Sequence, residues 1–183
     1  MPFRRSIWEL DQRYAISPDL VGKMDLSLIA RLQSIEAAKK RTPPAPLAQL
    51  AQIAERITKV PDLQTLTPLQ FAEFLGRLLV YGIGIKTAIC MLAVISKGAF
   101  PPMDEQVASG LLALGIVGPD EARMLNGTNV QRFSKVYVTR VLPAWTARRA
   151  EGISARDLDQ QWAAAGKQKA QLRAAGDAQA ARP

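Results

Sequence analysis

The chain of 183 residues contains no histidine and a single cysteine, Cys90. Without histidine the commonest general base and metal ligand are missing, so any catalysis must use carboxylates, amines or hydroxyls. One cysteine excludes an internal disulfide and any cysteine-based zinc or iron–sulfur site within the chain. Cys90 lies in an apolar run and is interpreted as a buried core thiol, with a nucleophile as the alternative. We expect no metal and no cofactor.

Long hydrophobic runs are also missing, because no stretch of about eighteen uncharged apolar residues occurs. The start, Met1-Pro2-Phe3-Arg4-Arg5, is not followed by the apolar stretch of a secretion signal. We therefore expect a cytoplasmic protein without a membrane partner. Aromatic residues are few, at 6%, whereas Ala, Leu, Gln and Arg are abundant, which favours helices over strands.

Apolar residues recur at helical spacing through most of the chain. This pattern predicts helices over 25–41 and 47–57, and a third that starts with Thr67 as its N-cap and Pro68 at its first position. After Asp104 a further helix is expected to close near Gly115.

Later signals predict three more helices. The Gly118-Pro119-Asp120 turn starts one, an apolar stripe over 133–142 forms the next and ends before Pro143, and Ser154 starts the last. Beyond Gly166 the chain has almost no large apolar side chain. The sequence thus predicts an all-α, compact orthogonal helical bundle over 1–165, with a frayed or disordered basic tail over 166–183.

The net charge is +8 and the isoelectric point is about 10.0. This charge suits a polyanionic partner, nucleic acid first and an anionic membrane second. The excess is spread along the chain, which argues against a single basic tail that does all the binding.

The stretch from Leu78 to Val107 reads LLVYGIGIKTAICMLAVISKGAFPPMDEQV. Gly82 and Gly84 lie between two apolar helical runs, where glycine tolerates a positive φ and the close approach of another backbone. Backbone N–H groups at such a hairpin and at the following helix N-terminus form a phosphate site. A tight turn without function is the alternative. A nucleotide-binding P-loop is excluded, because Lys86 does not directly follow a glycine.

The segment from Leu79 to Ala88 resembles the helix–hairpin–helix DNA-binding element. With the Pro-Met-Asp-x-x-Val motif that ends at Val107, it resembles the signature of DNA glycosylases, in particular that of the endonuclease III-like branch. Lys86 and Asp104 lie eighteen positions apart, which is similar to the spacing in that branch. The four-cysteine iron–sulfur loop of that branch is absent, which leaves a cluster-free relative.

The resemblance implies a helix–hairpin–helix element at 69–97 in a base-excision enzyme that flips a damaged or mismatched base and cleaves its N-glycosidic bond. Asp104 would be the catalytic acid, and Lys86 the amine nucleophile of a glycosylase with lyase activity. The expected DNA-binding residues are Gly82, Ile83, Gly84, Ile85, Lys86 and Thr87, with the isoleucines as anchors of the turn.

Alternatives stay open for both catalytic residues. Asp104 is also a good helix N-cap, and Lys86 is equally suited to contact a phosphate. Tyr81 and Met103 are candidates for a base pocket or wedge. The expected partner is double-stranded DNA, bound by a monomer at the nucleoid. The main alternative function is a non-enzymatic helix–hairpin–helix DNA-binding module, and a helical interaction protein is the third.

Overall fold

The computed structural model describes residues 48, 51, 62, 65–79 and 83–180. These residues form helices and turns, with no strand among them, so the predicted all-α class is confirmed. The helices predicted over 25–41 and, apart from residues 48 and 51, over 47–57 lie outside the described ranges. The chain divides into two compact units, Met1–Pro102 and Met103–Pro183. Each unit is described by itself, and the single domain over 1–165 stays a prediction.

Helix α4 (Pro68–Leu78) begins where the sequence predicted, with Thr67 as N-cap and Pro68 in its first turn. Thr67 Oγ1 accepts from the Gln70 N–H at 3.2 Å, and Gln70 Oε1 accepts in return from the Thr67 N–H at 3.0 Å. This reciprocal capping box satisfies two of the backbone donors that a helix start leaves without partners.

Helix α5 (Ile85–Ile95) is the apolar centre of the first unit. Every residue from Ala88 to Ala93 is buried, as expected for a helix that is hydrophobic on all sides. Helices α4 and α5 contact each other, and Phe71 of α4 stacks on Phe100 with ring centroids 5.9 Å apart. Because residues 80–82 lie outside the described ranges, the helix–hairpin–helix element stays a prediction.

The second unit starts with α6 (Glu105–Ala113), which ends as the sequence predicted. Gly115 has a φ of +69°, the Ile116 N–H donates to the Leu111 carbonyl at 2.9 Å, and the Gly115 N–H donates to the Leu112 carbonyl at 3.3 Å. This pair of bonds is a Schellman motif, which requires a residue that tolerates the left-handed conformation. Helix α7 (Pro119–Asn126) follows, with Gly118 as the N-cap, and confirms the predicted start.

The stripe predicted to end before Pro143 instead continues through it, which corrects that boundary. Helix α8 (Val130–Val136) passes into the π-helical turn η2 (Tyr137–Val141) and then into α9 (Leu142–Ala150), whose first turn contains Pro143. The Leu142 N–H donates to the Tyr137 carbonyl, which is the i→i−5 pattern of a π turn. A proline lacks an N–H and crowds the carbonyl one turn earlier, and the wider turn before Pro143 accommodates both effects.

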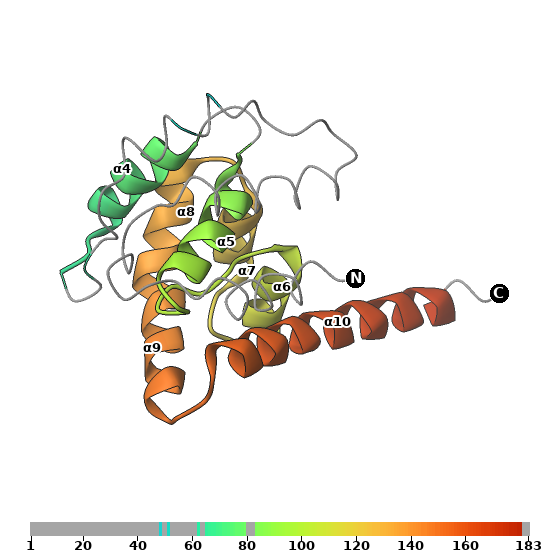
Figure 1. The fold of residues 1–183 in the computed structure, drawn as a ribbon. Coiled ribbons are helices and arrows are strands. Elements are labelled where there is room, and N and C mark those ends of the chain that lie inside the picture. The colour runs from blue at the N-terminus through green and yellow to red at the C-terminus, as the bar shows by residue number, and fades with distance from the viewer. Residues whose placement is uncertain (1–47, 49–50, 52–61, 63–64, 80–82, 181–183) are drawn as a thin grey trace. The chain divides into compact units, whose positions relative to one another are not determined.

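Helix α10 (Ala155–Ala180) starts at the predicted cap, because Ser154 Oγ accepts from the Asp157 N–H at 3.1 Å. It continues past Gly166 to Ala180, and the frayed or disordered tail over 166–183 stays a prediction. Gly166 lies where α10 crosses α6: a Cβ there would be 2.2 Å from the Gln106 carbonyl oxygen. A Cβ on Gly110 would be 1.7 Å from the Trp162 carbonyl oxygen. Both glycines therefore let two helix backbones touch, as α6 and α10 do in Figure 1.

Aromatic side chains close the core of the second unit. Trp145 of α9 and Trp162 of α10 meet edge to face with centroids 5.2 Å apart, and Phe133 stacks on Tyr137 at 5.4 Å. Such pairs contribute about 0.5–1.5 kcal/mol beyond the area that they bury. Of the helices in the described ranges, none has the length and apolar character that crossing a bilayer would take.

Candidate nucleic-acid interface and catalytic residues

Gly84 is the residue on which α5 starts. Its carbonyl accepts the first helical hydrogen bond, from the Ala88 N–H at 3.0 Å, so Gly84 is the N-cap. The residue is exposed, and apart from Gly84 and its two neighbours in sequence no heavy atom of the described chain lies within 4 Å of the position that a Cβ would take. The N-terminus of α5 therefore opens onto free space at this residue.

The conformation of Gly84 corrects one expectation. We predicted a positive φ and a close backbone approach, but the glycines with positive φ in the described ranges are Gly98, Gly115 and Gly152. At Gly84 the missing side chain leaves open space instead. The other hairpin glycine, Gly82, and Tyr81, the candidate wedge, lie outside the described residues.

The neighbours of Gly84 divide into anchors and exposed groups. Ile83 and Ile85 are buried, as anchoring of the turn requires. Lys86, in the first turn of α5, is partly exposed. Thr87 is only 1% exposed, and no residue in the described part of the chain bonds its Oγ1. The Thr87 hydroxyl, which we predicted to contact DNA, thus points into the first unit, and only its backbone remains suited to that role.

Asp104 is the N-cap of α6. One carboxylate oxygen, Oδ1, accepts from the Val107 N–H at 2.9 Å. The residue is half-buried and follows three buried residues, Pro101, Pro102 and Met103. The cap fixes the carboxylate in one orientation at the positive end of a helix, which favours the ionised form of an acid. The capping alternative is therefore confirmed as geometry, and a catalytic role stays a prediction.

The exposure of the remaining candidate residues shows which of them DNA could reach. Met103, predicted as a pocket or wedge side chain, has 0% exposure and belongs to the core, so it is not on a surface that a base could reach. Cys90 is buried in α5, as expected for a core thiol. Lys86 belongs to the first unit and Asp104 to the second. No group of three or more His, Cys, Asp or Glu residues within the described ranges could hold a metal ion.

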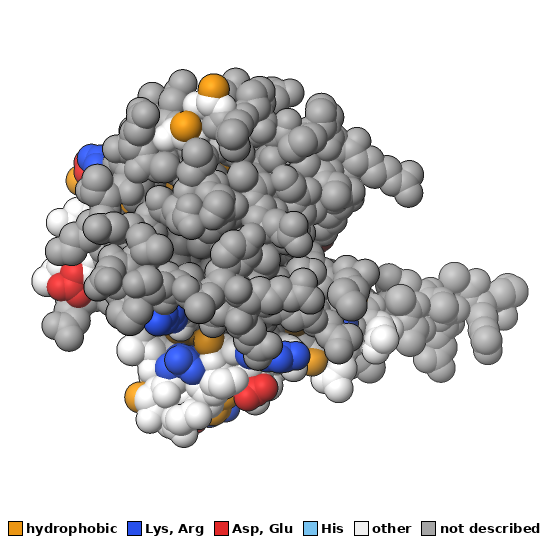
Figure 2. All heavy atoms as spheres, in the orientation of Figure 1, with side chains coloured by type: hydrophobic (Ala, Val, Ile, Leu, Met, Phe, Trp, Pro, Cys, Tyr) orange, Lys and Arg blue, Asp and Glu red, His pale blue; other side chains and the backbone are white. Residues whose placement is uncertain are grey.

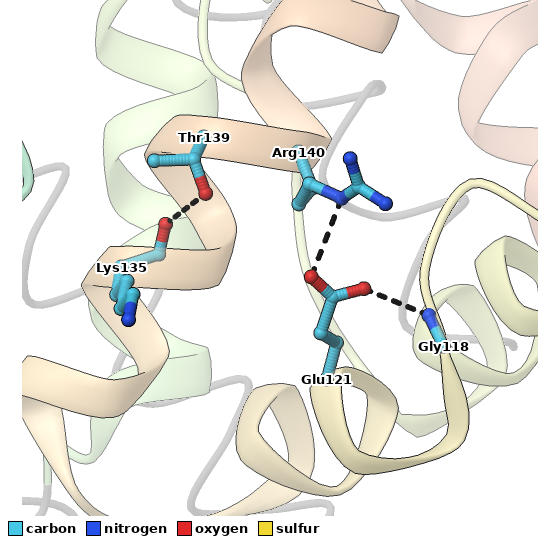
Figure 3. Close-up of polar contacts among 5 residues, drawn as sticks. All are labelled: Gly118, Glu121, Lys135, Thr139 and Arg140. Carbon is cyan, nitrogen blue, oxygen red and sulfur yellow. Dashed lines mark hydrogen bonds and ion pairs between the residues drawn. The ribbon is translucent and has the colours of Figure 1, made fainter.

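A charged cluster at the start of α7 was not foreseen. Glu121 Oε2 accepts from the Gly118 N–H at 2.8 Å, and Glu121 Oε1 pairs with Arg140 Nε at 3.3 Å (Figure 3). Figure 3 also shows Thr139, whose hydroxyl donates to the Lys135 carbonyl at 2.7 Å in the region of the π turn. The signal for Glu121 was available, because an acid three residues after a cap is the capping-box position. Its partner Arg140 comes from another helix and carries no local signal.

Basic side chains also gather where α9 turns into α10. In Figure 2 the described Lys and Arg side chains lie mainly in the lower part of the view, the region of these two helices in Figure 1. Arg148 pairs with Glu151 at 2.6 Å, and Arg149 donates to the Ile153 carbonyl at 2.8 Å. Both arginines thus stabilise the C-terminus of α9 and the turn after it.

Comparison of the chain with protein-family models, with curated proteins and with solved structures gives no match.

Proposed function

We propose that the protein binds double-stranded DNA through the connection between α4 and α5 and excises a damaged or mismatched base. The observation that carries the proposal is the carboxylate of Asp104, held by the Val107 N–H at the start of α6. Base excision needs a preorganised negative charge, because the sugar becomes positively charged as the base leaves. A carboxylate whose orientation the backbone already fixes meets this need without further ordering.

Support for DNA binding comes from the start of α5. Gly84 leaves the N-terminus of this apolar helix open at its cap, and Lys86 is partly exposed in its first turn. Helix N-termini attract phosphate groups, and a nearby ammonium adds a second attraction. The net charge of +8 favours association with a polyanion over the whole chain.

The reaction would proceed in three steps. The target base leaves the stack, which costs least for a damaged or mispaired base. The bond between the base and C1′ then breaks, the base departs with its electron pair and takes up a proton, and Asp104 stabilises the sugar cation. Finally water, or the Lys86 amine, attacks C1′ and loses a proton, which balances the one that the base takes up. Water gives an abasic site. The amine gives a Schiff base when the C1′–O4′ bond of the sugar opens, and strand cleavage can follow from it.

A second candidate is a DNA-binding module without chemistry. The observation that favours it is the same hydrogen bond to Val107, because an N-cap explains Asp104 by its structural role alone. In that case the open start of α5 would remain a phosphate clamp.

Activity on defined lesions separates the two. Duplexes that carry uracil, 8-oxoguanine, alkylated bases or a mismatch would be incubated with wild type, Asp104→Asn and Glu105→Gln. Glu105 is the exposed acid next to Asp104, so its variant removes the same charge from the same helix start. Excision by wild type and Glu105→Gln but not by Asp104→Asn supports the enzyme. If wild type cleaves no substrate yet binds DNA in a salt-dependent way, the module is correct.

The nucleophile is tested by reductive trapping. Borohydride would convert a Schiff base to a stable protein–DNA adduct, which is visible on a denaturing gel. An adduct that forms with wild type and is lost in Lys86→Ala assigns the amine to Lys86. Base release without any adduct assigns the attack to water.

A further inference from the structure

An open hollow of about 470 Å³ lies between the end of α7 and the start of α8, within the second unit. Five of the seven residues that line it have polar or charged side chains, although most of its lining surface is apolar. The lining side chains that matter here are Asp120, Arg123, Met124, Thr128, Asn129 and Arg132. We refer to this feature as the α7–α8 hollow.

The hydrogen-bonding groups of the α7–α8 hollow are mostly donors. Asn129 Oδ1 accepts from the Arg132 N–H at 3.0 Å. The side-chain NH₂ group of Asn129 takes no part in this bond, so it can donate to a ligand. Thr128 adds an exposed hydroxyl. The one carboxylate, Asp120, is already paired with Arg123 on the surface. A ligand that brings acceptor oxygens and negative charge fits this set.

Arg132, which lines the hollow, and Lys135, three residues further along α8 and outside the lining, differ from neighbouring cations in their lack of an ion pair within the described residues. Arg132 and Lys135 are exposed and lie one helical turn apart on α8, so they face the same side. Within the described part of the chain, no carboxylate lies within ion-pair distance of either side chain. By contrast, Arg140 and Arg148 are paired with Glu121 and Glu151.

The sequence around Arg132 and Lys135 adds to the positive charge of this region. Between Gly127 and Ala150 the chain contains no Asp or Glu, so every charged side chain of α8, η2 and α9 is basic. An exposed pair of cations on such a segment, next to a hollow rich in donors, has the features of a phosphate-binding surface. The hollow is also wider and more open than a single enclosed oxyanion would need, which favours an extended strand over a free ion.

We propose that the α7–α8 hollow, with Arg132 and Lys135, binds the phosphodiester backbone of a nucleic acid as a contact site separate from the start of α5. Arg132 and Lys135 would hold phosphates, while Thr128 and Asn129 donate to phosphate oxygens. Such contacts position a strand without reading its sequence. The site belongs wholly to the second unit, so it does not depend on the hairpin being a DNA clamp.

The test compares charge removal at Arg132 and Lys135, on the same side of α8, with charge removal on another helix. Arg132→Gln, Lys135→Gln and the double variant would be compared with Arg156→Gln, which removes an exposed arginine from α10, outside the residues that line the hollow. Binding to labelled single- and double-stranded oligonucleotides would be followed by fluorescence anisotropy over a range of salt concentrations. All three substituted side chains are exposed, so circular dichroism should show unchanged helix content.

Each lost phosphate contact should lower the slope of log K against log salt by about 0.9 for duplex and about 0.7 for single strands. We expect the slope to fall by the value of about one contact for each single variant and of about two contacts for the double variant. Arg156→Gln should keep the wild-type slope. Wild-type slopes for the double variant would overturn the proposal. Equal losses for Arg156→Gln would also overturn it, because general charge would then explain the binding.

Two further arms identify the source of the phosphate. Inorganic phosphate should shift the amide signals of Thr128 to Arg132 only weakly, and an oligonucleotide should shift them strongly. If inorganic phosphate saturates these signals and the oligonucleotide does not, the hollow is a free-anion site and the proposal fails. If the double variant loses binding to phosphatidylserine vesicles and keeps its binding to nucleic acid, a membrane surface is the partner instead.

A parallel variant, Lys86→Gln, keeps this proposal distinct from the proposed function. Loss of binding in Arg132→Gln without loss in Lys86→Gln supports the hollow and counts against the hairpin clamp. The reverse pattern supports the clamp and rejects the hollow.

Discussion

Helices α5 and α6 start on opposite kinds of residue. Gly84 precedes α5, brings no side chain and leaves the space around it open. Asp104 precedes α6 and supplies its own anion, bonded to the Val107 N–H. Both starts are electropositive because their first backbone N–H groups have no partner within the helix. The difference shows how one kind of helix end can either accept an external anion or hold an internal one.

The largest effect is expected when the negative charge of Asp104, at the start of α6, is removed. Asp104→Asn keeps an acceptor for the Val107 N–H but removes the negative charge, so stability should change by less than about 0.5 kcal/mol. Base excision should fall by about a hundredfold or more, as for loss of a preorganised electrostatic contact. Single-turnover rates on the preferred lesion measure the fall. Unchanged rates would reduce Asp104 to a cap.

The next effect comes from giving α5 the type of cap that α6 has. Gly84→Asp would place a carboxylate where a phosphate is proposed to bind, and duplex affinity should fall by about tenfold through like-charge repulsion. Stability should rise by about 0.5 kcal/mol, because Asp is a better N-cap than Gly and complements the helix dipole. Anisotropy titrations and thermal melts measure the two.

Gly84→Asn is the matched control, because it supplies a cap without the charge. Its affinity should lie between those of wild type and Gly84→Asp. Equal affinity for wild type and Gly84→Asp would remove the start of α5 from the interface.

A smaller effect is expected when the side-chain acceptor at the N-cap of α6 is removed. Asp104→Ala leaves the Val107 N–H without its acceptor and should lower the free energy of unfolding by about 1 kcal/mol. Urea denaturation of Asp104→Ala and Asp104→Ser measures it, since Ser restores an acceptor. If Ala and Ser variants were equally stable, the bond of 2.9 Å would contribute nothing to folding.

The smallest effect concerns a third type of helix start, at α7. There Gly118 is the cap, and Glu121 both accepts from its N–H and pairs with Arg140. Glu121→Gln keeps the acceptor and loses the ion pair, so the unfolding free energy should fall by less than about 0.5 kcal/mol, as for other solvent-exposed pairs. A double-mutant cycle with Arg140→Gln isolates the pair. A coupling well above this value would mean that the π turn depends on it.

The sequence predicted the elements that local chemistry determines. Thr67-Pro68, Asp104, Gly115 and Ser154 mark helix ends through caps and a left-handed turn, and the structure has each of them at the expected place. Such signals act within three or four residues, so they can be recognised without knowledge of the fold.

Non-local contacts explain what the sequence did not predict. Gly166 has no local feature that reveals its role, which depends on Gln106 and Gly110 of another helix. Pro143 has the local features of a break, but the π turn before it accommodates the ring. The α7–α8 hollow is likewise formed by residues of two helices and has no signature in either one. Spatial proximity of this kind cannot be read from one sequence.

The crossing of α6 and α10 has a consequence for how the chain tolerates mutation. Positions 110 and 166 each admit no side chain, because the atom that a Cβ would strike is backbone and cannot rotate away. In a saturation library the two positions should therefore accept glycine alone, although one lies in a segment that composition marks as permissive. Any related chain that replaces one glycine would need to separate the two helices, and would then be free to replace the other.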